Sequence, residues 1–236
     1  MVKRSRRSPL TAESGVRFPV GSPMALTREE NIFLAKKLFQ ELVFNTAYIE
    51  GVNVTFPQTQ AILDGAIVNN VTVDDIQKVL NLRDAWKYAL SDVDAELTIP
   101  YICKVNEYVS RNESLAWGVL RNGTVGVSGT DYIPPIPNPQ EVESELARIK
   151  QIPDIKERAI EYFCYSIHSQ LFWDGNKRTS TIVTCKILIE NGEGILSIGK
   201  DIALDFNNAL KNYYDTSDPS PLKTVLYKCI QNTFTK

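Results

Sequence analysis

Apolar residues recur every three or four positions along most of the chain from residue 27 onward, which is the spacing of one face of an α-helix. Two helix starts carry capping signatures, because Thr27 precedes Glu30 by three residues and Thr55 precedes Gln58 by three. The spacing predicts helices over residues 27–43, 55–63, 72–90, 98–112, 141–151, 154–171, 176–191, 201–214 and 222–234. We therefore expect a mainly α protein.

The helical period stops between Trp117 and Pro139, where glycine, proline and β-branched residues predominate. The pair Asn122-Gly123 favours a tight turn, because both residues tolerate a positive φ angle. We predict a β-hairpin centred on this pair and, after it, an extended proline-rich segment. The predicted architecture is a helical bundle with one small β-hairpin.

The 236 residues are 43% hydrophobic and 23% charged, and the net charge of −2 gives no global polybasic signal for nucleic acid. Four cysteines without a C-x-x-C pair, together with a single histidine, provide no zinc-ligand set and are typical of a reducing compartment. No run of apolar residues is long enough to span a membrane. We expect a cytoplasmic protein without a membrane segment.

Residues 1–24 differ from the remainder in charge. They contain five lysines and arginines and one glutamate, so this segment carries +4 and the remaining chain −6. One interpretation is an arm that binds nucleic acid or directs targeting. The other is a disordered extension with Met24 as an alternative start, and we favour it because short basic runs are weak signals.

A short loop joins two of the predicted helices and runs into the string Asp174-Gly175-Asn176-Lys177-Arg178. The second helix would present free backbone N–H groups beside a glycine, which is the geometry of an anion-binding nest. Lys177 and Arg178 could add phosphate contacts, and Asp174 could hold Mg²⁺. The same residues also suit an ordinary turn between helices, and spacing alone does not separate the two interpretations.

The longer string Phe172-Trp-Asp-Gly-Asn-Lys-Arg178 resembles the core motif of the Fic/Doc (Fido) family, His-x-Phe-x-(Asp/Glu)-Gly-Asn-(Gly/Lys)-Arg, which lies on a helix–loop–helix. Two further segments match the family in the expected order. Thr46-Ala-Tyr-Ile-Glu50-Gly51 resembles the inhibitory motif of the class with an N-terminal inhibitory helix, and residues 117–137 resemble the hairpin flap. The resemblance covers the chain from about Leu26 onward.

The resemblance divides the chain into a tail over residues 1–24, N-terminal helices over 25–66, and a Fic core over 67–236 with the flap at 117–137. It implies that an extended segment of a target protein pairs with the flap edge by β-augmentation. The alternative is a hairpin that only stabilises the fold. The candidate docking residues are Leu120, Arg121, Val125 and Val127.

The resemblance also implies an activity. The loop would bind the phosphates of ATP, Asp174 would hold Mg²⁺, and AMP would be transferred to a Ser, Thr or Tyr hydroxyl of a protein. The candidate nucleotide-binding residues are Gly175, Asn176, Lys177 and Arg178. A lysine at position 177 matches the Doc branch, in which the γ-phosphate is transferred instead.

Three positions depart from the family pattern, and the first concerns the catalytic base. Gln170 stands where the family has its histidine. A glutamine amide is no general base near neutral pH, and the loss of a base typically costs about 10²–10⁴-fold in rate. His168 would point to nearly the opposite side of the helix, because two residues are about 200° apart. We therefore expect Gln170 at the catalytic position and an activity that is weak or altered.

The other departures are Lys177, described above, and Thr181, which replaces the family's second arginine. That arginine grips the γ-phosphate and pairs with the inhibitory glutamate, so Glu50 has lost its usual partner. Glu50 could reach Arg178 or Lys177 instead, or it could be an exposed carboxylate at a helix end. The candidate regulatory residues are Thr46, Glu50 and Gly51.

Three functional hypotheses follow. The first is a Fic-like protein that transfers AMP, or phosphate as in the Doc branch, with reduced or altered activity. The second is a catalytically inactive Fic fold that regulates by binding a nucleotide or a protein. The third is a nucleic-acid regulator that depends on the basic tail alone. The sequence leaves open whether the chain forms a homo-oligomer.

Overall fold

The computed structural model describes residues 26–231, so the tail predicted over residues 1–24 lies outside the described part of the chain. The elements in chain order are α1 (Arg28–Lys37), α2 (Phe39–Ile49), α3 (Phe56–Leu63), α4 (Val73–Ser91), α5 (Ile99–Val109), α6 (Pro139–Lys150), α7 (Ile155–Ser169), α8 (Asn176–Glu190), β1 (Ile195–Leu196), α9 (Ala203–Thr216), α10 (Ser220–Lys228) and β2 (Ile230–Gln231).

The mainly helical fold predicted from the apolar spacing is confirmed, with corrections at several helix boundaries, and α5 ends at Val109 rather than at residue 112. The first predicted helix is divided at Leu38, whose φ of −87° and ψ of 8° end α1, and α2 then continues to Ile49. Helix α7 ends at Ser169 because Gln170 takes a left-handed conformation, with φ 45° and ψ 62°. Helix α10 ends at Lys228, and the chain continues into β2.

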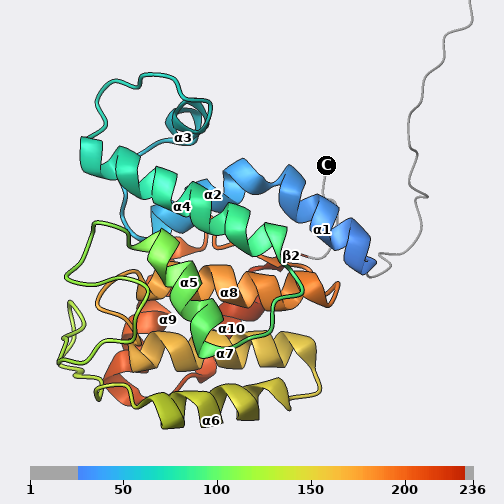
Figure 1. Ribbon diagram of the computed structural model, residues 1–236, viewed down its shortest axis with the longest axis vertical. Coiled ribbons are helices and arrows are strands. Elements are labelled where there is room, and N and C mark those ends of the chain that lie inside the picture. The colour runs from blue at the N-terminus through green and yellow to red at the C-terminus, as the bar shows by residue number, and fades with distance from the viewer. Residues whose placement is uncertain (1–25, 232–236) are drawn as a thin grey trace, which may run out of the picture.

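Helix α8 lies at the centre of the fold (Figure 1) and contacts α7, α5, α4, α1, α2 and β1. Every residue of α8 except Lys177 and Glu190 is buried, which is expected of a helix that neighbours surround on all sides. Since these contacts fix the position of α8, they also fix its N-terminus and the loop that precedes it.

A small antiparallel strand pair is present, but it lies elsewhere than predicted. Strands β1 and β2 pair with Ile195 opposite Gln231 and Leu196 opposite Ile230. Residues 117–137, which we call the flap segment, contain no strand. The hairpin predicted around Asn122-Gly123 is therefore not formed.

The flap segment is instead tied to the loop after α7. The N–H of Arg121 donates to the carbonyl of Leu171 at 3.0 Å. A Cβ atom at Gly123 would lie 2.5 Å from the ring of Trp173, so the backbone and the indole are in close contact. Neither Asn122 nor Gly123 has the positive φ of a two-residue hairpin turn. The contacts with Leu171 and Trp173 outweigh the local turn preference of this pair.

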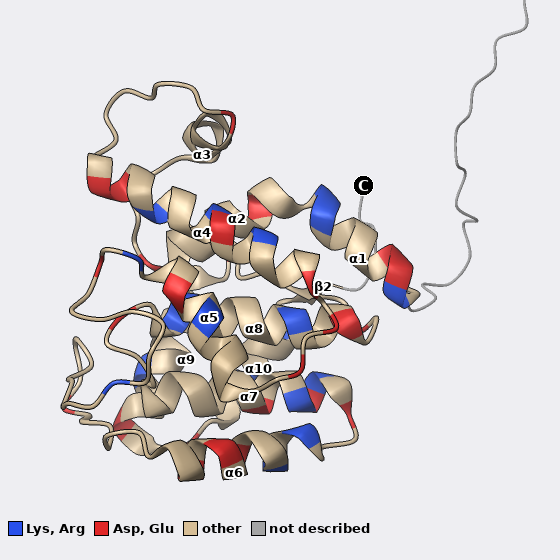
Figure 2. Cartoon of the chain, in the orientation of Figure 1, with Lys and Arg blue, Asp and Glu red and all other residues tan. Residues whose placement is uncertain are grey.

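Charged residues of both signs are interspersed over the helices, and Figure 2 shows no long stretch of a single sign in this view. Within residues 26–231, no helix combines the length and the apolar character needed to cross a membrane.

Candidate functional site

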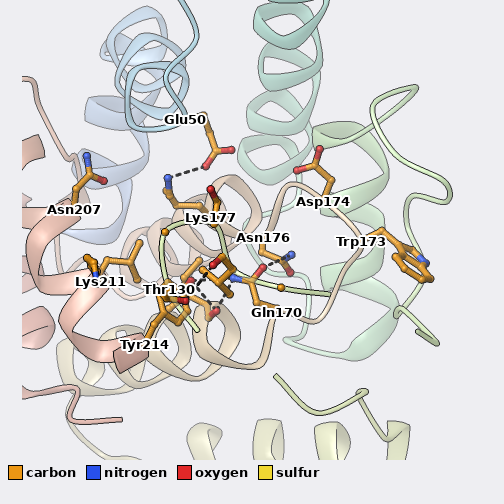
Figure 3. Close-up of a pocket in the computed structure, with 16 residues that line it drawn as sticks. Glu50, Thr130, Gln170, Trp173, Asp174, Asn176, Lys177, Asn207, Lys211 and Tyr214 are labelled. Atoms are coloured by element: carbon orange, nitrogen blue, oxygen red, sulfur yellow. Dashed lines mark hydrogen bonds and ion pairs between the residues drawn. The ribbon is translucent and has the colours of Figure 1, made fainter. Parts of the chain in front are cut away.

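A cavity of about 530 Å³ opens beside the N-terminus of α8 (Figure 3). Its walls come from the end of α2, the flap segment, the loop before α8, and α9. Helix α9 contributes one face, with residues at positions 207, 210, 211 and 214. The cavity brings together six of the sequence-predicted residues: Glu50, Val127, Gln170, Asp174, Asn176 and Lys177.

Two buried asparagines brace the loop that precedes α8. The side chain of Asn176 accepts from the N–H of Phe172 at 2.9 Å, and it donates to the carbonyl of Phe172 at 2.8 Å and to Oε1 of Gln170 at 3.0 Å. Asn106 of α5 donates to the carbonyl of Asp174 at 2.9 Å. Hydrogen bonds shielded from water make this loop a rigid support.

Gly175 forms the turn into α8 with a φ of 73°. A Cβ atom at this position would lie 2.7 Å from Cγ1 of Val109, so α5 closely backs the turn. Among the described residues, no side chain caps α8. The first N–H groups of the helix, including those of Asn176 and Lys177, therefore lack intrahelical partners and favour an anion at the cavity.

Gln170 lines the cavity, and both the nitrogen and the oxygen of its amide are hydrogen-bonded to neighbouring elements. Its Nε2 donates to the carbonyl of Ile167 at 2.8 Å and to the hydroxyl of Tyr214 at 2.9 Å, and its Oε1 accepts from Asn176 at 3.0 Å. Burial raises the pKa of Tyr214 well above its usual value, so this phenol does not supply the missing base. Gln170 therefore links α7, α8 and α9 as a neutral connector.

His168 does not line the cavity. Its Nδ1 lies 2.9 Å from the hydroxyl of Tyr132, and its ring stacks on Tyr213 with centroids 4.5 Å apart. Burial lowers the pKa of His168, so the ring is neutral near pH 7. The structure thus places this histidine in an aromatic cluster, as the 200° helical offset from Gln170 indicated.

Arg178 is buried below the cavity and does not line it. Its Nη1 donates to Oε2 of Glu113 at 2.7 Å and to the carbonyl of Val109 at 3.2 Å, and its Nη2 lies 3.3 Å from Oδ1 of Asp174. Its Nε lies 3.3 Å from Oε2 of Glu50. Burial lowers the pKa of Arg178, but the three carboxylates outweigh burial and keep the pKa above its usual value.

Glu50 reaches both cations that the sequence offered as partners. Its Oε1 lies 3.4 Å from Nζ of Lys177 in addition to the contact with Arg178. The Lys177 ammonium also donates to the carbonyl of Ile49 at 2.9 Å. The C-terminus of α2 therefore faces the N-terminus of α8, an arrangement that the two helix dipoles favour.

The other two residues of the inhibitory-like motif have structural contacts. Thr46 donates to the carbonyl of Leu42 at 2.7 Å and accepts from the indole of Trp86 at 3.2 Å. Gly51 has a φ of 74° and ends α2, and the next N–H, of Val52, donates back to the carbonyl of Ala47 at 3.1 Å. This turn places Glu50 over the cavity.

Asp174 is the one predicted metal ligand. Its carboxylate is 44% exposed, and Oδ1 accepts from the N–H of Gly175 at 2.5 Å. Within the described residues, Oδ2 has no hydrogen bond, and no group of three or more Asp, Glu, His or Cys side chains forms a metal site. A single carboxylate beside an uncapped helix N-terminus is compatible with Mg²⁺, which is commonly held by one or two carboxylates together with phosphate groups.

Arg121, predicted as a docking residue, is buried instead. Its guanidinium donates to five carbonyls, those of Gln170, Gly123, Pro135, Pro134 and Ser169, at 2.5 to 3.3 Å. Burial lowers its pKa. Leu120 and Val125 are half-buried, and Val127 lines the cavity. Arg121 thus fixes the flap segment to the end of α7, and target docking at the other three positions stays a prediction.

Sequence reasoning missed several contributors to this site. Asn207, Lys211 and Tyr214 share one helical face of α9, so a closer reading of that helix could have found them. Asn106 and Glu113 lie on or just after α5, far from the loop in sequence, and no local pattern marks them. Their roles depend on tertiary contacts alone.

The sequence profile of the Fic/DOC family matches residues 96–188. The protein adenylyltransferase Fic of Drosophila erecta is 25% identical over 209 residues, which cover 84% of this chain and 41% of that protein. The protein of the same name from Drosophila persimilis is 23% identical over 210 residues, with coverage of 84% and 40%. This chain therefore spans about two fifths of the length of these relatives.

Solved structures share the fold. Fic-1 from C. elegans superimposes with a TM-score of 0.68 at 20% identity and covers 82% of this chain and 60% of that one. A Fic family protein from Desulfovibrio desulfuricans G20 gives 0.68 at 17% identity, with coverage of 84% and 64%. A Fic domain containing signaling protein from Bacteroides thetaiotaomicron gives 0.66 at 17% identity, with coverage of 86% and 87%.

Proposed function

Since this chain contains a Fic/DOC-family domain, we propose that it binds ATP or another nucleotide at the cavity beside α8 and transfers AMP weakly to a protein hydroxyl. The observation that carries the proposal is the uncapped N-terminus of α8, which opens into the cavity with Gly175 at its turn. The curated relatives carry the name protein adenylyltransferase, which supports nucleotidyl transfer at the level of the family.

The phosphate-binding group comprises the backbone of Gly175 and Asn176 together with Lys177. Lys177 adds a mobile positive charge once Glu50 moves. Asp174 would hold Mg²⁺, which neutralises phosphate charge when bound. The chain's own task is then to orient the phosphates and exclude water. Targets would dock along the flap segment.

The weakness of the transfer follows from Gln170. Its amide does not accept a proton near neutral pH, and both its nitrogen and its oxygen already make hydrogen bonds within the protein. The same observation favours a second candidate, a catalytically inactive Fic fold that binds a nucleotide or a protein partner and regulates by binding. If the protein does transfer a group, Lys177 favours transfer of the γ-phosphate, as in the Doc branch, over transfer of AMP.

Labelled ATP separates these candidates. The protein is incubated with Mg²⁺, a cell lysate and ATP labelled on either the α- or the γ-phosphate. Transfer of the α label supports AMP transfer, and transfer of the γ label alone supports phosphotransfer. Without transfer, calorimetric ATP binding that Asp174→Ala weakens, and that the control Asp84→Ala on α4 leaves unchanged, supports the binding protein. Absence of any nucleotide binding would reject the proposal.

Restoring a base gives the strongest prediction for activity. We expect Gln170→His to raise the transfer rate by roughly 10²–10⁴-fold, the usual contribution of a positioned base. His168→Phe is the matched control, because that histidine does not line the cavity. If His168→Phe abolished a wild-type activity while Gln170→His had no effect, the assignment of position 170 would be wrong.

A further inference from the structure

The position of Arg178 conflicts with a simple role as a phosphate ligand. Its side chain is 3% exposed and is surrounded by the carboxylates of Glu50, Glu113 and Asp174. It can contact a phosphate only after some of these contacts are lost. The question is which of the carboxylates controls that release.

Glu113 holds Arg178 firmly and does not itself line the cavity. One of its oxygens lies 2.7 Å from Arg178, and the other accepts from Nδ2 of Asn81 at 2.9 Å. Its side chain is 9% exposed, and its N–H donates to the carbonyl of Ser110 at 3.0 Å in the turn after α5. Both its backbone and its side chain are therefore anchored to α4 and α5.

Glu50 holds Arg178 less firmly. Its carboxylate is 19% exposed and lines the cavity, and its 3.3 Å contact with Nε lacks the alignment of a hydrogen bond. It also divides its charge between Arg178 and Lys177. A ligand entering the cavity can therefore displace Glu50, whereas Glu113 does not line the cavity.

We propose that Glu113 is a second restraining carboxylate, and that loss of the Glu50 contact alone does not release Arg178 to a phosphate. This inference rests on the proposed function, because it concerns how the same cavity binds a nucleotide. While Glu113 is paired with Arg178, only the backbone of α8 and Lys177 bind the phosphates. Arg178 contacts the phosphates only when its ion pair with Glu113 is also broken.

The balance of charges supports this arrangement. Two cations, Arg178 and Lys177, are surrounded by three carboxylates within 3.4 Å of one or the other. Loss of the Glu50 charge leaves equal numbers of cations and anions, so no excess positive charge appears. Loss of the Glu113 charge as well leaves an excess of one positive charge, which attracts a phosphate.

The test measures the affinity for Mg-ATP by calorimetry in wild type, Glu50→Gln, Glu113→Gln and the double variant. Glutamine keeps the shape of each side chain and removes only its charge. We expect Glu50→Gln to raise the affinity by less than about threefold and the double variant by roughly tenfold or more, the worth of one charge-assisted contact. Adding Arg178→Leu to the double variant should remove that gain. Glu107→Gln, which alters an ion pair with Lys104, replaces Glu113→Gln in the control double variant.

The inference is overturned if the double variant unfolds at a lower temperature but binds Mg-ATP no more tightly than wild type, because Glu113 would then have only a structural role. A Glu50→Gln variant that binds as tightly as the double variant also overturns it, although nucleotide binding itself would then stand. If no variant binds Mg-ATP, the proposed function fails as well. If the double variant does not fold, Glu113→Asp is combined with Glu50→Gln instead, and a gain supports the inference while no gain overturns it.

Discussion

The two sides of the loop before α8 bury a cation in different ways. On the α7 side, Arg121 is held by five carbonyl oxygens, and no carboxylate among the described residues pairs with it. On the α8 side, Arg178 is held by three carboxylates and a single carbonyl. Gln170 and His168, both neutral, belong to the first side.

This difference separates contacts with the backbone from contacts with side chains. The carbonyls around Arg121 belong to the backbone, and their positions are fixed by the course of the chain. The carboxylates around Arg178 are side chains, and at least Glu50 lies where a ligand can reach it. The neutral side therefore holds the flap segment and the loop in place, and the charged side can change its partners.

The largest effect is expected from Arg178→Met. Removing the guanidinium takes away the cation beside the largely buried carboxylates of Glu50 and Glu113, which should lower the free energy of unfolding by about 3–5 kcal/mol. Adding Glu113→Gln should restore about 1–3 kcal/mol of this loss, because one uncompensated charge disappears. A double-mutant cycle followed by urea unfolding measures the coupling. Equal stability of Arg178→Met with and without Glu113→Gln would contradict the ionic account of this side.

Arg121→Met should cost somewhat less, about 3 kcal/mol, because it leaves several buried carbonyls without donors. No single carboxylate substitution should compensate, and Glu113→Gln in the Arg121→Met background tests this. Arg148→Met on the surface of α6 is the matched control, with an expected loss of about 0–1 kcal/mol for an exposed ion pair. A loss at Arg121 no larger than at Arg148 would mean that the flap segment is fixed by other contacts.

The helices could be predicted because their signals are local. Caps such as Thr27 with Glu30 and the apolar spacing both act within a few residues, so the sequence contains all that is needed. The prediction of a hairpin is wrong because contacts between residues distant in sequence determine this segment. Asn122-Gly123 has a strong local turn preference, but Arg121 and Trp173 attach the segment to a distant loop.

The site divides along the same line. That Gly175, Asn176 and Lys177 meet at the turn into α8 could be predicted because they are consecutive, and phosphate binding there stays a prediction. The partners of Arg178 could be anticipated only in part, because the sequence suggests a contact of Glu50 with Arg178 or Lys177, or an exposed Glu50, and it does not mark Glu113. Glu113 lies 65 positions from Arg178, and only the packing of α5 against α8 brings them together.

The smallest predicted effect is a dependence of stability on pH from the neutral side. Burial lowers the pKa of His168, so below about pH 6.5 the unfolded chain binds a proton that the folded chain resists. The free energy of unfolding should therefore fall as the pH is lowered through this range, with a slope from this residue of no more than about 1.4 kcal/mol per pH unit.

Because His168 is the only histidine in the chain, its contribution can be isolated. His168→Phe keeps a ring between Tyr132 and Tyr213 but has no proton to bind, so its stability should depend less steeply on pH between 5 and about 7. Urea unfolding of both proteins across this range measures the difference in slope. An identical slope would mean that protonated His168 is tolerated beside Tyr132, and that the aromatic cluster around it is less apolar than its contacts indicate.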